Sequence, residues 1–386
     1  MMKKTTWIAS WILLLSMGQT EAFAQDIRID MSKAYPEKTV SLQKVAEVKY
    51  IPLETTDEVL FNGMLTQLST EGIAGFNKKQ GDILVFDGVG KVIASFNHTG
   101  QGPNEYNQIY HLDVDWKQKE IYVQDNFRQK IRIYSLNGNP LRTIQLQETM
   151  RESDLYAFSD THLIYYAQPK TKPVTPYQPV TLLSKKDGST VTLPFTKTED
   201  VNVMATGGPF GNMKLPAKIV CQLHKMGNEV YVNEVTADII YRVENNQALT
   251  PVAQRIPSYQ DVSGKDFFLM LTGANARYYF FKRQQALLEF QGNAASDTKS
   301  TYVAYDRKEK QLLNLTFINE DYPSLDIPMS KLLQCAGSTN RCYLQLEAFK
   351  LKEALAEGKL KGTLKSIAEK LDEEDNPVLM VVEFKK

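Results

Sequence analysis

The sequence has few cysteines, no excess of charge and few histidines, and these shortages exclude several classes of function. Its 386 residues hold 45 Lys and Arg against 45 Asp and Glu, so nothing in the composition attracts a polyanion and no nucleic acid partner is expected. The four histidines, His98, His111, His162 and His224, have no metal-ligand spacing with one another. No G-x-S-x-G, H-E-x-x-H or EF-hand motif is present, so no cofactor or metal is expected.

Three cysteines are present, and none belongs to a C-x-x-C pair. Cys335 and Cys342 bound the small polar stretch CAGSTNRC, and in an oxidising compartment we expect them to form a disulfide. Two free thiols are the alternative. Cys221 follows Ile219 and Val220 and is expected to pack as a small hydrophobic side chain.

The only long apolar stretch lies at the beginning of the chain. Lys3 and Lys4 precede an apolar segment at 7–17, and Ala22-Phe23-Ala24 resembles a cleavage site, which predicts a signal peptide removed after Ala24. The alternative is a membrane anchor, but the segment is shorter than the ~20 residues that a bilayer requires. No cysteine follows it, so no lipid anchor is expected. No later segment is apolar enough to span a membrane, which predicts an exported protein, periplasmic or secreted.

The remaining chain is rich in short alternating runs joined by turn residues. In GDILVFDGVGKVIASF (81–96), Ile83 and Val85 face one way and Leu84 and Phe86 the other, and the Asp-Gly turn returns the chain, so the stretch predicts a β-hairpin. The same strand-turn-strand pattern recurs at 130–146, 180–193, 238–253 and 301–315, and a single strand at 376–386 ends the chain.

These hairpins recur at a regular spacing. The residues that end the strand before each turn lie 48, 49, 58, 64 and 79 residues apart; they are Phe86, Tyr134, Leu183, Tyr241, Tyr305 and Phe384. Several strands in a period near 40–50 residues are typical of propeller blades. The sequence therefore predicts an all-β fold, a six-bladed β-propeller, formed by residues 25–386 as a single domain.

A ring of blades has to be closed, and the last repeat ends without a return strand. The strand-like segment at 39–54 is expected to join the sheet of the last blade, so that N-terminal and C-terminal strands pair. Helical spacing at 346–358 and 362–375 predicts short helices inserted near the C-terminus, before the closing strand. A Gly- and Pro-rich segment at 204–216 lies where the third blade passes to the fourth and is expected to line the channel face.

The stretches IPLETTDEVLFNG (51–63), ILVFDGVGKVIASFNHTGQGPNEY (83–106) and IYVQDNFRQKIRIYSLNGNPLRTI (121–144) carry a resemblance to a known family. They resemble the six-bladed β-propellers of exported Bacteroidota proteins, which are similar to NHL-repeat propellers, and the ending DEEDNPVLMVVEFKK is similar too. The resemblance implies the fold and an exported setting. It implies no reaction and no catalytic residue.

The segment HTGQGPNEY (98–106) is expected to carry the chain from the outer strand of one blade to the inner strand of the next, with Tyr106 filling the gap between blades. A strand follows it, whereas a phosphate-binding loop needs a helix there. In a four-stranded blade such connections share one face with the loops between second and third strands. The candidate ligand-binding residues on this channel face are His98, Gln101, Glu105, Asn126, Arg128, Gln129, Glu234, Asp238, Lys282 and Arg283.

Mixed donors and acceptors around a funnel suit a polar ligand. We therefore expect a non-catalytic propeller that binds a glycan, a peptide or a partner protein. One alternative is a polysaccharide lyase or hydrolase that uses acidic residues at this rim, and another is a structural or sensory scaffold. The candidate side chains also have a plainer interpretation, in which they tie neighbouring blades together. The stretch DVDWKQKE (113–120) holds two carboxylates but too few ligands for calcium, and it predicts the end of an inner strand with its hairpin turn.

Overall fold

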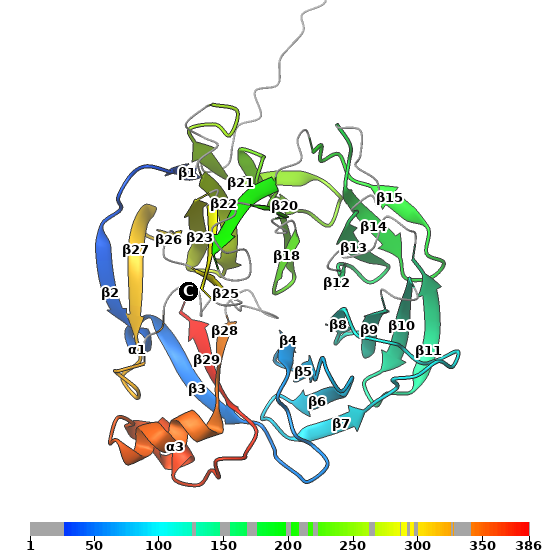
Figure 1. Ribbon diagram of the computed structural model, residues 1–386, viewed down its shortest axis with the longest axis vertical. Helices are drawn as coiled ribbons and strands as arrows, with labels where there is room; N and C mark the ends of the chain where they lie inside the picture. The colour runs from blue at the N-terminus through cyan, green and yellow to red at the C-terminus, as the bar shows by residue number, and fades with distance from the viewer. Residues whose placement is uncertain are drawn as a thin grey trace, which may run out of the picture.

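Six sheets stand side by side around a common axis in the computed structural model (Figure 1), which confirms the predicted six-bladed β-propeller. The structure describes residues 27–125, 129–146, 155–167, 176–197, 202–207, 215–218, 223–261, 267–285, 287–291, 294–296, 300–325, 327 and 341–385. Each blade is built on antiparallel strands, blades 4 and 5 each add one parallel strand at the outer edge, and the inner edge of each sheet lies nearest the axis.

The first three blades have four strands each. Blade 1 contains β4 (Met64–Leu68), β5 (Gly72–Phe76), β6 (Ile83–Asp87) and β7 (Val92–Phe96). Blade 2 contains β8 (His111–Asp115), β9 (Glu120–Asp125), β10 (Lys130–Ser135) and β11 (Pro140–Gln145). Blade 3 contains β12 (Leu155–Ala157), β13 (His162–Tyr166), β14 (Val180–Ser184) and β15 (Thr190–Thr192).

The last three blades include strands from the N-terminal part of the chain. Blade 4 contains β18 (Leu223–Met226), β19 (Glu229–Val232), β20 (Ile239–Val243), β21 (Leu249–Ile256) and β1 (Ile27–Asp30). Blade 5 contains β22 (Phe267–Ala274), β23 (Tyr278–Gln285), β26 (Ser300–Asp306), β27 (Gln311–Ile318) and β2 (Glu37–Ser41). Blade 6 contains β28 (Arg341–Leu346), β29 (Val378–Phe384) and β3 (Ala46–Pro52).

Burial on both faces holds neighbouring blades together. In β6, Ile83 and Val85 pack in a cluster with Leu112 of blade 2, whereas Leu84 and Phe86 pack in a cluster with blade 6. All four β6 side chains are at most 1% exposed. Each such side chain stabilises the fold by about 1.5–3 kcal/mol relative to an exposed one, so the alternation seen in the sequence builds the contacts between blades.

The N-terminal part of the chain runs along three blades. β1 pairs in parallel with β21, β2 pairs in parallel with β27, and β3 pairs antiparallel with β29 over seven residues. Of the segment 39–54 expected in the last blade, 46–52 lies there, but 39–41 belongs to β2 and joins blade 5 instead. The short helix α1 (Leu42–Val45) separates the two strands and redirects the chain.

Two further helices precede the closing strand β29. They are α3 (Ala348–Ala356) and α4 (Gly362–Ala368), and they pack on blades 5 and 6 through Leu351 and Leu364. No helix within the described ranges is long and apolar enough to cross a membrane. Cys342 in β28 is fully buried and disulfide-bonded. The two other cysteines of the chain lie outside the described residues, so its predicted bond to Cys335 stays a prediction.

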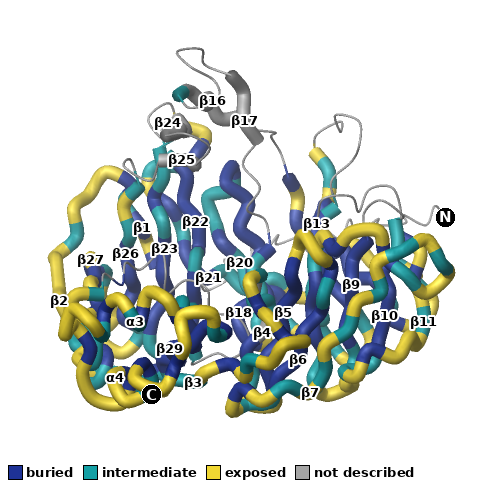
Figure 2. The backbone as a smooth tube through the Cα atoms, turned by 60° about the horizontal axis from the view of Figure 1, so that its bottom comes forward, coloured by how far each residue is buried: buried dark blue, intermediate teal, exposed yellow. Residues whose placement is uncertain are grey.

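A seventh sheet is built from two insertions. It contains β16 (Asn202–Gly207), β17 (Leu215–Lys218), β24 (Leu287–Gln291) and β25 (Ala294–Ser296), and β16 pairs in parallel with β24. In the ring itself, Figure 2 shows β5 and β6 mostly buried and β2 mostly exposed.

Successive turns of an antiparallel sheet lie at opposite ends of its strands, so the ring has two distinct ends. We call the end that carries the turns β4–β5, β8–β9, β12–β13 and β18–β19 the first-turn end. We call the other the second-turn end, and it carries the turns between second and third strands and the connections between blades. Both insertions of the seventh sheet leave the ring at the second-turn end.

Candidate functional site

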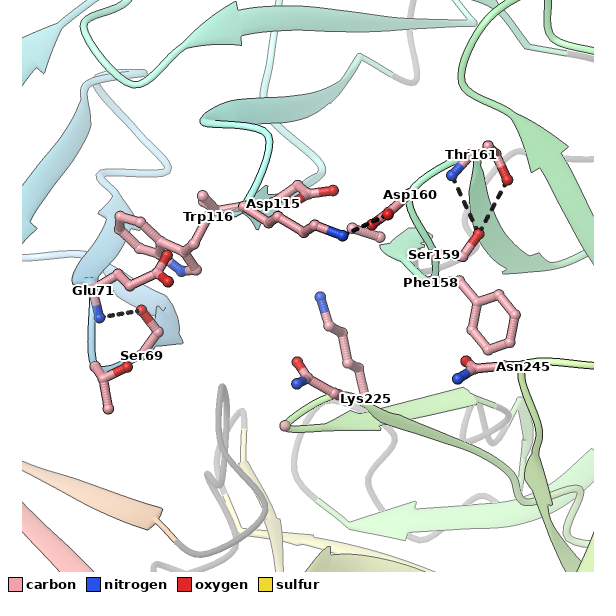
Figure 3. A pocket seen from close by; sticks show the side chains of 16 residues that line it. Ser69, Glu71, Asp115, Trp116, Phe158, Ser159, Asp160, Thr161, Lys225 and Asn245 are labelled. Atoms are coloured by element: carbon pink, nitrogen blue, oxygen red, sulfur yellow. Dashed lines mark hydrogen bonds and ion pairs between the residues drawn. The ribbon is translucent and has the colours of Figure 1, made fainter.

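A cavity of about 740 Å³ opens at the first-turn end, where four inner strands turn back (Figure 3). Its walls are the turns at 69–71, 115–117, 158–161 and 227–228, together with Lys225 and Asn245. Blades 1 to 4 each contribute, and these turns belong to the strands nearest the axis. We call this cavity the axial pocket.

An ion pair across blade boundaries forms part of its base. Asp113 and Asp115 alternate with Val114 along β8, so both carboxylates lie on one face of the strand. Asp113 Oδ2 accepts a hydrogen bond from Lys225 Nζ on β18 at 2.8 Å and another from the Ala157 amide at 2.6 Å. The side chains of Asp113 and Lys225 are 3% and 11% exposed, so a nearly dry ion pair links blades 2, 3 and 4.

A second pair neutralises the other carboxylate of β8. Lys185 Nζ donates to Asp115 Oδ2 at 2.6 Å. Burial alone would raise the pKa of Asp115, but the hydrogen bonds from Lys185 and from the Gln118 amide outweigh it and hold that pKa below its usual value. Asp115 is therefore a carboxylate that stays ionised.

The exposed mouth of the pocket carries a third pair. Lys117 Nζ donates to Asp160 Oδ2, and this bond raises the pKa of the lysine. Both side chains are mostly exposed, so the pair contributes little to stability. Three lysines are thus held by three carboxylates, and Glu71 pairs with no cation within the described part of the chain.

Two aromatic side chains line the same space. Trp116 comes from the β8–β9 turn and Phe158 from the β12–β13 turn, and both are half-buried. Trp116 packs on Gly72 of blade 1, where an added Cβ would lie 2.5 Å from one ring carbon. The indole N–H is buried and has no hydrogen-bond partner among the described residues.

A second cavity, of about 560 Å³, lies at the second-turn end between blades 1 and 2. Lys78, Lys79 and Gln80 line it from the β5–β6 turn, and Thr99 and Asn107 line it from the connection to blade 2. It shares Thr99 with the predicted loop at 98–106, but none of the eight described candidate side chains lines it. No group of three metal-ligating side chains gathers anywhere in the described ranges.

The eight described candidates lie at the second-turn end, opposite the axial pocket. Several of them make contacts that stabilise the fold. His98 Nε2 lies 2.8 Å from the Gly138 carbonyl, and its ring stacks on Tyr134 at a centroid distance of 5.1 Å. Glu105 accepts from the Gly102 amide at 2.5 Å within its own loop. Tyr106 is fully buried and donates to the Gly81 carbonyl at 2.6 Å, so it fills the gap between blades.

The later candidates also make contacts within the protein. Glu234 accepts from Tyr166 at 2.5 Å and pairs with Lys197 at 3.5 Å. Asp238 accepts from Ser258 at 2.6 Å. Arg283 donates to the Lys33 carbonyl at 2.6 Å, which fastens the N-terminal segment to blade 5.

The remaining candidates are spread apart. Lys282 lies over the Tyr302 ring at 5.9 Å, Gln101 is exposed, and Gln129 adopts a positive φ of 52° in the β9–β10 turn. Asn126 and Arg128 lie outside the described residues. The structure therefore brings the eight described candidates to one end of the ring but gathers no group of them around a cavity.

The sequence did not predict that the residues of the axial pocket form a site. The stretch DVDWKQKE forms the end of β8, its turn and the start of β9, and it supplies Asp113, Asp115, Trp116 and Lys117 to the site. The signal was a pair of carboxylates in alternation followed by a tryptophan at a turn. The lysines that pair with Asp115 and Asp113 lie 70 and 112 residues further along the chain, so no local sequence pattern indicates these ion pairs.

Comparison with known proteins supplies a family and a fold. Residues 26–383 match the model of a family described as a domain of unknown function, DUF4934. A crystal structure of a "putative exported protein" from Bacteroides fragilis is similar, with a TM-score of 0.64 and 17% identity, over 94% of this chain and 100% of that one. These two matches confirm the resemblance to six-bladed propellers of Bacteroides.

Other solved structures are less similar. A member of the DUF4221 family from Bacteroides vulgatus has a TM-score of 0.49 and 9% identity, over 89% of this chain and 98% of that one. A virginiamycin B lyase from Staphylococcus aureus has a TM-score of 0.38 and 9% identity, over 87% of this chain and 99% of that one. Likenesses at this level carry no argument about activity. No curated protein matches the chain.

Proposed function

Because the chain belongs to the DUF4934 family, whose description names no activity, its function has to be argued from its own geometry, and we propose a non-catalytic propeller that binds a polar ligand in the axial pocket. One observation carries the proposal: a cavity of about 740 Å³ that four blades line with charged, amide and aromatic side chains. Ligand sites usually enclose about 300–1,000 Å³ and combine apolar walls with a few polar groups.

Groups able to bind a ligand remain in this pocket. The side-chain amides of Asn228 and Asn245 make no hydrogen bond within the described part of the chain, and each amide offers donors and an acceptor. The ten candidates predicted from the sequence remain an alternative ligand site. We place the ligand in the axial pocket because five of those candidates already bond within the protein.

An enzyme is the weaker candidate. A glycoside hydrolase needs two carboxylates that exchange protons with the substrate and its water. In the axial pocket, Asp115 and Asp160 are each held by a lysine, and so is Asp113 at its base. This pairing favours binding over acid–base catalysis, and it favours binding over a scaffold that would use only the blade edges.

Export is part of the proposal. The leader-like residues 1–24 support it, and so does the description of the Bacteroides fragilis relative. N-terminal sequencing of protein recovered from the periplasm and the medium should give Gln25 as the first residue. A mature protein that retains Lys3 and Lys4 would contradict cleavage after Ala24.

Calorimetric titration against a panel of oligosaccharides and short peptides tests the binding proposal. We expect a panel ligand to lose at least about tenfold in affinity in Phe158→Ala, because that ring forms one wall of the pocket, and a tenfold loss equals about 1.4 kcal/mol. Phe349→Ala is the matched control, since Phe349 is 45% exposed on α3 and does not line the pocket.

Three results would contradict the proposal. Binding that survives Phe158→Ala but is lost in Glu234→Gln would move the site to the second-turn end. New reducing ends or unsaturated products released from a bound polysaccharide would favour the lyase or hydrolase. Absence of binding to the whole panel, with a partner protein captured at the blade edges, would favour the scaffold.

A further inference from the structure

We propose that the axial pocket selects neutral carbohydrate, with Trp116 as the ring on which a sugar stacks and Gly72 as the residue that positions that ring. This inference rests on the proposed function and names the chemical class of its ligand. It is carried by the packing of Trp116, by the side chains that face it and by the balance of charge around the cavity.

The position of the Trp116 ring is fixed by its packing against β5 of blade 1. The ring packs on the backbone of β5 at Gly72, where an added Cβ would lie 2.5 and 2.6 Å from two ring carbons and 2.7 Å from the Phe86 carbonyl oxygen. Only a residue without a side chain therefore allows the ring to lie this close to the strand. A ring fixed in this way loses little conformational entropy when a ligand stacks on it, which favours binding.

The composition of the opposite walls suits a sugar. A pyranose presents apolar C–H groups on its faces and hydroxyl groups around its edge, so it needs an aromatic surface and amide or carboxylate partners together. Phe158 and Asn245 lie on the far side of the cavity from Trp116 (Figure 3). Glu71, next to Gly72 in the chain, adds an acceptor beside the Trp116 wall.

The charge around the pocket disfavours an acidic ligand. Its walls and base hold four carboxylates, on Glu71, Asp113, Asp115 and Asp160, but only three ammonium groups, on Lys117, Lys185 and Lys225. Each ammonium group pairs with one carboxylate and Glu71 is left in excess, so a uronate or sulfate group would meet net negative charge. A neutral sugar avoids that repulsion.

The sequence offers a direct probe of this pocket. The chain has three tryptophans, and the other two, Trp7 and Trp11, lie in the leader. The described fold begins at Ile27, so a protein without residues 1–24 keeps all of it and has Trp116 as its one tryptophan. Its tryptophan emission then reports the axial pocket alone.

The experiment titrates this protein with cellotetraose, mannotetraose and xylotetraose, and in parallel with tetragalacturonate and a neutral tetrapeptide. We expect a saturable change in Trp116 emission with at least one neutral oligosaccharide and at least tenfold weaker binding of tetragalacturonate. Gly72→Ala should shift the emission of the free protein and weaken sugar binding at least tenfold, whereas Phe349→Ala should change neither. Thermal melting of each variant separates loss of binding from loss of fold.

Calorimetry with Trp116→Leu gives a second readout if Gly72→Ala folds poorly, since leucine keeps an apolar side chain and removes the ring. Sugar affinity equal to that of the unchanged protein in this variant would overturn the inference. So would saturable binding of the tetrapeptide or tetragalacturonate with no response to any neutral sugar, although the proposed function would then survive. No response to any probe in either measurement would overturn both.

Discussion

Val382→Asp is expected to destabilise the whole ring by at least about 4 kcal/mol, because it places a carboxylate in the sheet where the two ends of the chain meet. Val382 is fully buried in β29, between Cys342 of β28 and Val48 of β3. Urea unfolding followed by Trp116 emission measures the effect. Trp116 follows β8 of blade 2, which blade 1 separates from blade 6, so the readout comes from outside the blade that carries the substitution.

The same substitution at Val191 is the matched control. Val191 lies in β15, the outermost strand of blade 3, and is 46% exposed, so Val191→Asp should cost less than about 1 kcal/mol. If closure makes the ring one cooperative unit, the Trp116 transition in Val382→Asp moves together with the loss of circular dichroism. A Trp116 transition that stays at its original urea concentration would show that the blades unfold independently.

Asp113→Leu is expected to cost about 3 kcal/mol, because it leaves the Lys225 ammonium group without its carboxylate and the Ala157 amide without its acceptor. Lys225 borders the pocket and can be partly hydrated there, which keeps the cost at the lower end for a buried pair. The double variant Asp113→Leu with Lys225→Met should regain at least half of the loss, since an apolar pair replaces the ionic one. Chemical unfolding of the three proteins measures both changes.

The exposed pair at the mouth of the pocket is the control for this experiment. Asp160→Leu removes the partner of Lys117, and the two side chains are 64% and 73% exposed. The expected change is within about 0.5 kcal/mol. A double variant no more stable than Asp113→Leu alone would contradict the view that the lysine, rather than lost packing, causes the penalty.

Hairpins are local in sequence, and for that reason the sequence predicted the blades well. Strand alternation and Asp-Gly or Asn-Gly turns depend on neighbouring residues only, so β6 and β7 could be predicted as a hairpin and the faces of β6 correctly assigned. Five of the six marker residues, among them Phe86 and Tyr305, lie in the third strand of their blades. The last, Phe384, lies in β29.

Features that depend on distant residues were not predicted. Glu37–Ser41 pairs with a strand almost 280 residues away, and β16 pairs with β24 across 80 residues, which no local pattern indicates. Residues 204–207 and 215–216 belong to the Gly- and Pro-rich segment that was expected to line the channel face, and they lie in β16 and β17 of the seventh sheet. The ligand-binding candidates were hard to predict for the same reason. Polar residues that were expected to face the channel, such as Glu234, bond to buried partners from other blades.

Hydrogen–deuterium exchange with a saturating panel ligand tests most directly the claim that the ligand binds at the first-turn end. We expect the ligand to protect the turns at 69–71, 115–117 and 158–161 from exchange, because these backbones form the walls of the axial pocket. Protection at 98–106 and 233–238, with unchanged exchange in those three turns, would contradict it.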